Sequence, residues 1–314
     1  MIKERNFNKN TQLDFSVKPK SLSLFLLINK YFWKSIIGPV FGVLIPFIFI
    51  LVFYGMATAK ERPYLYINAF SGIIVFTVFP LCFFSLAATN LEFRKSIFLR
   101  KLKNESLTKI QYLSILIGYY LMIIFGFCLL NTCIFFLFCT NPTEYKVEVQ
   151  NNFINTLTFQ DVISNINVLS LIVSFFLLIF QTISFALLIS TIINNPITIQ
   201  FAGFGVMLLT LTLSGQILPI VQWVEISFLK YLALINPIGY PVNLMNIATI
   251  FTYTPEMNDI FNFAINTEVI YKPVVADNYI VYFGWEKPIL LFTPIILSSI
   301  FCFLNIKFFK WINR

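Results

Sequence analysis

Residues 91–109 read LEFRKSIFLRKLKNESLTK and separate two long apolar runs, residues 68–90 and 111–139. The segment carries six basic residues against two acidic ones, and Phe98 and Leu102 lie one helical turn apart. Such a segment can act only as an orientation signal, because Lys and Arg fix which ends of the neighbouring spans stay in the cytoplasm. It can also form a helix that docks into a partner protein on the cytoplasmic side. The rest of the sequence decides between these two interpretations.

The composition predicts an all-α integral membrane protein. The chain has 314 residues, of which 58% are hydrophobic and 11% are charged, and its mean hydropathy is +0.81. A soluble domain carries about 25% charged residues, so this chain could not cover its surface in water. We expect a multi-pass protein of the plasma (cell) membrane, in contact with membrane lipids. The basic residues follow the ends of the apolar runs, which argues against a nucleic-acid partner.

Six apolar runs predict six transmembrane helices. They cover residues 36–57, 68–90, 111–139, 168–193, 198–213 and 288–306. Pro80 predicts a kink in the second helix, and Ser106 is a candidate N-cap before the third. Residues 1–20 form a polar tail, and residues 21–35 predict an amphipathic helix that lies in the membrane interface. The alternative for residues 21–35 is a cytoplasmic extension of the first span.

The distribution of charge predicts that both ends of the chain are cytoplasmic. If the N-terminus is inside, residues 1–35, 91–110, 194–197 and 307–314 face the cytoplasm and together hold 16 of the 22 basic residues. The segments that face outward, residues 58–67, 140–165 and 221–287, hold six basic and ten acidic residues. An excess of Lys and Arg on the inner segments is the usual orientation signal.

One apolar stretch, residues 228–251, does not fit a simple span. If it crossed the membrane, the basic C-terminal segment would lie outside. Two prolines and three asparagines also interrupt it, and broken backbone at membrane depth is tolerated only where protein covers it or where it lines a cavity. We predict that residues 219–249 form one or two short re-entrant helices that enter from outside.

The sequence lacks the residues that most catalytic and cofactor sites use. It has no histidine, no P-loop and no Gly-x-Ser-x-Gly motif. The five cysteines lie in or beside apolar runs and are interpreted as buried free thiols. The central parts of the spans carry no Asp, Glu, Lys or Arg, which argues against a proton-coupled transporter, although a Na⁺ site of carbonyls and hydroxyls stays open. We expect no catalytic residue, no metal site and no cofactor on this chain, so that energy for any work comes from a partner.

The order of these features resembles the membrane subunit of a type-2 ABC exporter, the ABC-2 permease family. Members have an amphipathic connecting helix before span one, a basic coupling helix between spans two and three, and a re-entrant hairpin after span five. The acid-then-Arg signature of their coupling loop matches Glu92 and Arg94. Their motif after span five matches Ser214, Gly215, Pro219, Asn236, Pro237 and Tyr240. The chain departs from the family in having no Pro near the end of the coupling loop and in the length of residues 252–287.

The resemblance implies a cytoplasmic tail at residues 1–20, a connecting helix at 21–35 and a six-span membrane domain at 36–314. The domain would contain the coupling loop at 91–109 and an extracellular segment at 214–287. The chain itself would not be an enzyme, because separate ABC ATPase subunits would bind ATP and Mg²⁺ and dock on the loop. Two such membrane subunits would pair as a homodimer or a heterodimer. The residues implied at the ATPase contact are Glu92, Arg94, Phe98, Arg100, Lys101 and Leu102, with Phe98 and Leu102 in a groove and the basic residues meeting acids on its rim.

The function implied by the resemblance is outward movement of an amphipathic or lipid-like substrate by an ATP-driven exporter. The spans are rich in Phe, which suits an apolar cargo, and Phe76, Phe204, Thr210 and Thr212 are the candidates to face its path. Two other classes stay open. One is a secondary transporter or channel that needs no ATPase, and the other is a membrane enzyme or assembly factor.

Overall fold

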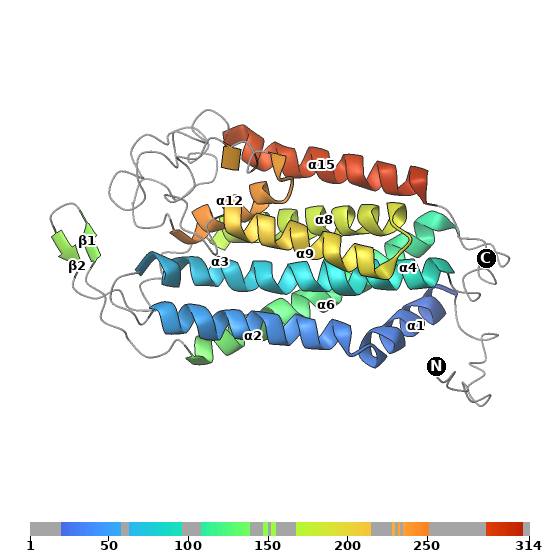
Figure 1. Ribbon diagram of the computed structural model, residues 1–314, viewed down its shortest axis with the longest axis horizontal. Coiled ribbons are helices and arrows are strands. Elements are labelled where there is room, and N and C mark those ends of the chain that lie inside the picture. The colour runs from blue at the N-terminus through green and yellow to red at the C-terminus, as the bar shows by residue number, and fades with distance from the viewer. Residues whose placement is uncertain are drawn as a thin grey trace.

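The computed structural model describes residues 20–57, 63–95, 108–138, 147–149, 152–154, 168–214, 228–229, 232, 235–250 and 287–309. These ranges are almost entirely helical. The helices are α1 (Lys20–Lys34), α2 (Ile37–Ala57), α3 (Pro63–Pro80), η1 (Leu81–Leu86), α4 (Ala87–Lys95), α6 (Lys109–Phe138), α8 (Val168–Ile192), α9 (Pro196–Leu213), α12 (Gly239–Ile250) and α15 (Lys287–Phe308). A short antiparallel pair joins β1 (Val147–Val149) to β2 (Asn152–Ile154). Figure 1 shows the long helices side by side, with α1 at one end of the bundle and the β-hairpin at the other.

The chain is a multi-pass membrane protein, and its described residues contain about five or six helices apolar enough to span a membrane. Five helical segments are long and apolar enough to cross a membrane, namely Ser71–Lys95, Lys109–Phe135, Val168–Ile192, Pro196–Leu213 and Leu291–Phe308. A sixth follows if α1 and α2, which meet at a bend of 57°, count as one broken span. The helices lie where the apolar runs of the sequence predict them, because a run of about 20 apolar residues is a strong local signal.

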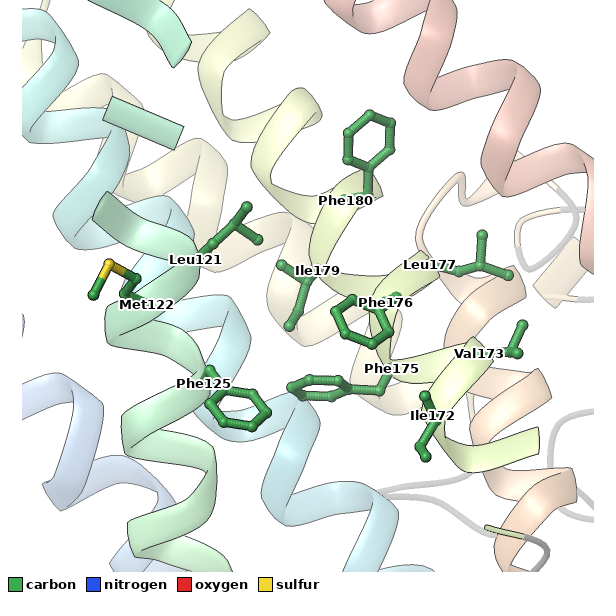
Figure 2. A pocket seen from close by; sticks show the side chains of 10 residues that line it. All are labelled: Leu121, Met122, Phe125, Ile172, Val173, Phe175, Phe176, Leu177, Ile179 and Phe180. Carbon is green, nitrogen blue, oxygen red and sulfur yellow. The ribbon is translucent and has the colours of Figure 1, made fainter. Parts of the chain in front are cut away.

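The outward faces of the bundle are apolar, as a membrane requires. Met122 and Phe125 on α6 and Phe176 and Phe180 on α8 are all exposed. Lipid tails are as apolar as these side chains, so their exposure is not unfavourable in a bilayer. Between α6 and α8 the side chains border a groove of about 660 Å³. Figure 2 shows its lining, three residues of α6 and seven residues of α8 that are all apolar.

Helix α1 packs against protein along one stripe and exposes its basic side. Leu24, Ile28 and Phe32 follow each other at intervals of four residues and are fully buried. The Phe32 ring meets the Tyr120 ring of α6 edge to face, with 6.0 Å between the centroids. Lys30 is exposed. The helix predicted at residues 21–35 is therefore present, and its apolar stripe rests on α6.

The second span, which the sequence predicts to kink at Pro80, runs from Ser71 to Lys95 as one segment. Its departure from α-helical geometry is the π-helix η1, which begins directly after Pro80. The N–H of Ala87 bonds the carbonyl of Cys82 five residues earlier. Pro80 has no N–H to donate to the preceding turn, so the helical ladder is already interrupted where the wider turn begins.

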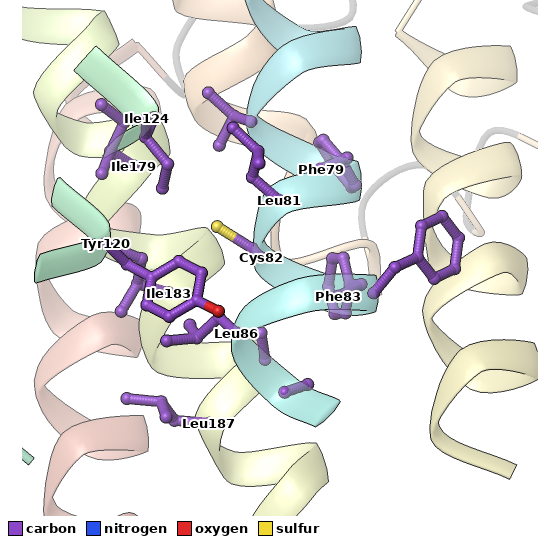
Figure 3. Packing of buried hydrophobic residues seen from close by; sticks show 14 of the residues in the cluster. Phe79, Leu81, Cys82, Phe83, Leu86, Tyr120, Ile124, Ile179, Ile183 and Leu187 are labelled. Atoms are coloured by element: carbon purple, nitrogen blue, oxygen red, sulfur yellow. The ribbon is translucent and has the colours of Figure 1, made fainter. Parts of the chain in front are cut away.

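All six residues of η1 are buried, which makes this segment the centre of the core. Figure 3 shows Cys82 on the side of the helix that faces Tyr120 and Ile124 of α6 and Ile183 of α8, with Phe83 directed away from them. The hydroxyl of Tyr120 lies 2.9 Å from Oγ of Ser85 and 2.8 Å from Oγ1 of Thr89. These bonds fix α6 against the second span where the surroundings are otherwise apolar.

Two helix starts show caps formed by short polar side chains. Thr108 caps α6, since its Oγ1 accepts from the N–H of Gln111 at 3.2 Å while Oε1 of Gln111 accepts from the N–H of Thr108 at 3.1 Å. The predicted cap, Ser106, lies outside the described residues, and the structure shows the capping residue to be Thr108. Asn195 caps α9 by accepting from the N–H of Ile197, with Pro196 in the first turn.

Close helix contacts around η1 depend on glycine. A Cβ on Gly42 of α2 would lie 3.0 Å from Cδ2 of Leu81, and a Cβ on Gly203 of α9 would lie 2.6 Å from Cβ of Phe83. The flexible end of a leucine can yield by a few tenths of an ångström, whereas Cβ of Phe83 is fixed by its own backbone. Gly203 therefore sets how closely α9 approaches the second span.

We predict that Gly203→Ala destabilises the protein by about 1–3 kcal/mol, because the added methyl group forces α9 away from Phe83. Gly205→Ala is the matched control on the same helix, since nothing lies within 4 Å of its added Cβ. The control should unfold at the wild-type temperature or above it, because Ala is the better helix former. Thermal unfolding in detergent measures both variants, and equal midpoints would refute the contact.

Candidate functional site

The two flanks of the basic segment lie at one end of the bundle, beside the ends of α1, α8 and α15 and the start of α9. Helix α4 ends at Lys95, and α6 begins at Lys109. The predicted contact residues Glu92 and Arg94 lie on α4, whereas Phe98, Arg100, Lys101 and Leu102 lie outside the described residues. The site is therefore built from the flanks and from the side chains that they contact.

Arg94 is buried, with 3% of its surface exposed. Its Nη1 donates to the carbonyls of Ser190 and Thr191 at 2.6 Å and 3.1 Å. These residues form the last turn of α8, where backbone carbonyls have no intrahelical donor and the helix dipole favours a positive charge. The sequence implies a guanidinium on the rim of a partner contact, and the structure has it inside the chain as a cap on α8.

Beside Arg94, a buried chain of hydrogen bonds joins three helices. Nδ2 of Asn90 donates to Oγ of Ser190 at 2.7 Å, and the hydroxyl of Tyr112 donates to Oδ1 of Asn90 at 3.1 Å. All three side chains are fully buried. The Asn90 amide therefore donates to α8 and accepts from α6, as a fully buried polar group requires.

Phe309, which directly follows α15, brings the sixth predicted span to the same place. The guanidinium of Arg94 lies over its ring at 5.4 Å from the centroid. The ring of Tyr112 lies 5.7 Å from it, centroid to centroid. The carbonyl of Phe309 accepts a hydrogen bond of 2.9 Å from Nζ of Lys109, at the start of α6. Phe309 thus contacts both flanks of the basic segment.

The described basic residues of residues 91–109 share one role, which is to donate to backbone carbonyls at helix ends. Arg94 does so for α8, and Lys109 does so for Phe309 beyond α15. Lys95 donates to the carbonyl of Asn194, in the turn between α8 and α9, at 2.5 Å. Cations near helix C-termini are stabilising because they oppose the partial negative charge there.

Three further hydrogen bonds, which involve Tyr31 of α1 and Asn305 of α15, fix neighbouring helices to this end of the bundle. The hydroxyl of Tyr31 on α1 donates to Oε2 of Glu92 at 2.5 Å. Burial, and then the hydrogen bond with Glu92, raise the pKa of the Tyr31 hydroxyl above its ordinary value, so it stays protonated and remains a donor. Asn305 of α15 donates to the carbonyl of Ser184 at 2.9 Å and accepts from Oγ1 of Thr191 at 3.1 Å.

These contacts unite the four segments that carry the inward charge signal. Tyr31 comes from residues 1–35, Arg94 and Lys109 from 91–110, Asn194 from 194–197 and Phe309 from 307–314. Each of the other three segments is bonded to residues 91–110, through Glu92, Lys95 and Lys109 respectively for Tyr31, Asn194 and Phe309. The predicted topology needs these four segments on one side, and their shared end of the bundle agrees with that need.

The motif predicted after the fifth span is bonded to α8 and α9. Asn236 is buried, and its Nδ2 donates to Oγ1 of Thr210 at 3.0 Å while its Oδ1 accepts from the N–H of Ile238. Nε2 of Gln181 donates to the carbonyl of Pro237 at 2.5 Å. Ser214 is buried, and Tyr240 lies in the first turn of α12. Gly215 and Pro219 lie outside the described residues.

The four residues predicted to face a substrate path do not converge. Phe76 stacks on Phe49 of α2, with 3.9 Å between ring centroids. Thr210 is fully buried against Asn236, whereas Phe204 on the same helix is exposed. Thr212 is half-buried. The feature that sequence reasoning missed is the groove of Figure 2, which gathers side chains of α6 and α8 instead.

No protein-family model, curated protein or solved structure matches this chain. Within the described ranges, no three His, Cys, Asp or Glu side chains gather as metal ligands.

We predict that Tyr112→Phe destabilises the protein by about 1–3 kcal/mol, because it leaves buried Oδ1 of Asn90 without this donor. Tyr119→Phe is the matched control, since it removes a bond of the same length, 3.1 Å, to a side chain that is only partly buried, Asn29. Water can replace the donor at Asn29, so the expected loss is small. Unfolding midpoints in lipid nanodiscs test the pair, and a control as damaging as Tyr112→Phe would contradict the role of burial.

Proposed function

We propose that this chain is the membrane-spanning permease subunit of an ATP-driven exporter of the ABC-2 type. A separate ATPase subunit binds ATP and Mg²⁺ and docks on the loop within residues 91–109. Two permease subunits, identical or different, pair in the plasma membrane. Closure of the ATPase subunits displaces the loop and switches the path between the two permeases.

The observation that supports this proposal most directly is that both flanks of the loop are hydrogen-bonded to the ends of other spans. Arg94 binds the last turn of α8, and Lys109 binds Phe309 after α15. A loop that served only as an orientation signal needs positive charge in solvent and no such internal contacts. A loop that receives force from a partner needs rigid attachment to the spans that move, and these contacts supply it.

The proposed orientation has the loop end of the bundle in the cytoplasm, together with both chain termini. It is supported by the excess of Lys and Arg in the four segments that meet there. Strands β1 and β2 lie at the other end of the bundle, which is extracellular in this proposal. Residues 214–287 then form the extracellular segment, and Gln181 of α8 donates a hydrogen bond to the proposed re-entrant hairpin at the carbonyl of Pro237.

The proposed substrate is an amphipathic or lipid-like molecule. It is supported by the 38 Phe residues of the chain and by the apolar groove between α6 and α8. A molecule with an acyl chain can reach such a groove from the bilayer without leaving an apolar environment.

Co-purification tests the function. A mild detergent extract of the tagged chain should contain a P-loop ATPase, whose activity in liposomes should rise when the permease is present. The alternative, a secondary transporter or channel, predicts substrate movement by the purified chain alone. Extracts that never contain an ATPase, together with no stimulation in liposomes, would decide for that alternative.

We predict that replacing both Phe98 and Leu102 by Ser uncouples ATP hydrolysis from transport while membrane insertion stays intact, because the apolar stripe that enters the ATPase groove is lost. Replacing Ile97 and Leu99 by Ser is the matched control, as both flank the stripe on a helix. The measurement is transport per ATP hydrolysed in proteoliposomes. An unchanged ratio in the Phe98 and Leu102 variant would argue against a coupling role.

We also predict that a tag fused after Arg314 is labelled only in permeabilised cells, because the charge distribution keeps this segment inside. A tag inserted between residues 150 and 151, between β1 and β2 in the sequence, is the opposite control and should be labelled in intact cells. Labelling of the Arg314 tag in intact cells would mean that residues 228–251 cross the membrane.

A further inference from the structure

We propose that Arg94 and Phe309 form a latch that carries displacement of the loop to the turn between α8 and α9, residues 193–195. Both are positioning residues, since they act through the helix ends that they hold. The proposal rests on the proposed function, because it names the route by which a docked ATPase moves the spans.

The first step of the route is the contact of Arg94 with α8. The guanidinium holds two carbonyls of the last turn, and Asn90 holds Ser190 of the same turn by its side chain. Separating α4 from α8 would break both of these hydrogen bonds of a buried cation, which is costly where the surroundings are apolar. The C-terminal end of α8 therefore moves together with α4.

The second step leads from the end of α8 into α9. Lys95 holds the carbonyl of Asn194, and Asn195 caps the first turn of α9. The turn is only three residues long, so it cannot absorb much displacement. Helix α9 in turn touches Phe83 through Gly203 without an intervening side chain. A shift of the turn is therefore passed on to the rigid helix behind it.

The third step explains why two residues are needed. Phe309 lies under the guanidinium of Arg94, and its carbonyl binds Lys109 on the other flank of the loop. Because both flanks contact this one residue, α4 and α6 cannot move apart without breaking one of the contacts. The latch thus makes the loop move as a unit with the ends of α8 and α15.

Hydrogen exchange of the α8–α9 turn tests the latch. The permease with its co-purified ATPase in nanodiscs is compared before and after trapping with ATP and vanadate. The peptide that covers residues 188–200 reports the turn. In the wild type we expect its exchange rate to change by roughly 5- to 150-fold on trapping, the usual range of coupling between sites.

Two variants break the latch in different ways. Arg94→Ala removes the cap, and Phe309→Leu keeps the cap and an apolar side chain but removes the ring below the guanidinium. Both should hydrolyse ATP in the complex while the response of the turn falls below the range expected for the wild type. Phe309→Leu remains informative if Arg94→Ala does not fold. Lys30→Ala, which changes an exposed cation of α1, is the control and should respond like the wild type.

The outcomes separate the latch from the proposed function. If no ATPase is present to trap, the proposed function and the latch fall together, whereas a trapped ATPase that leaves the wild-type turn unchanged overturns the latch alone. If the wild type responds and Phe309→Leu responds equally, the latch alone is overturned. If both variants lose the response and Lys30→Ala keeps it, the route through Arg94 and Phe309 is established.

Discussion

The last carbonyls of a helix that ends inside a protein need donors, and at α8 this need is met by Arg94. The contact satisfies both sides, since a buried guanidinium also needs acceptors. Once Arg94 is fixed to α8, the position of α4 is fixed, and η1 and α3 follow because they form one continuous span. The glycine contacts of Gly42 and Gly203 then bring α2 and α9 against that span. Much of the packing around the second span therefore depends on one charge at a helix end.

Polar side chains inside the bundle link helices where apolar contacts alone would not select one arrangement. Nδ2 of Asn131 on α6 donates to the carbonyl of Gly42 and to Oγ1 of Thr77, at 2.9 Å each. Apolar side chains gain little from meeting each other instead of lipid, so such bonds and close packing decide which helices pair. Gly42 contributes to the hydrogen bonding and to the close packing, because it admits a close helix contact and leaves its carbonyl within reach of Asn131.

The sequence predicts the helices well because long apolar runs, caps and prolines are local signals. The cap of α6 shows how even a local signal can be misassigned, since Thr108-x-x-Gln111 satisfies the capping-box pattern and Ser106 does not. The contacts of Arg94 cannot be predicted from the neighbouring sequence, because its acceptors lie 96 and 97 residues further along the chain. Phe309 lies beyond the predicted end of the sixth span, and nothing in its neighbourhood marks it as a contact. Thr210 was predicted to face a path, but its hydroxyl bonds Asn236 in a segment whose approach only the fold reveals.

The contacts at the loop end join residues that are far apart in the sequence, so these contacts can form only late in synthesis. Lys109 and Phe309 are 200 residues apart, so at a synthesis rate of about 5–20 residues per second some 10–40 s pass between them. During that interval the early helices are already inserted in the bilayer, while the later residues that Arg94 and Lys109 bind have not yet been synthesised. Water at the membrane surface must satisfy Arg94 and Lys109 until the later helices arrive. Contacts between early and late helices therefore have to form at the membrane–water interface. The ends of the spans lie there, whereas the middle of the bilayer has no water to satisfy polar groups in the meantime.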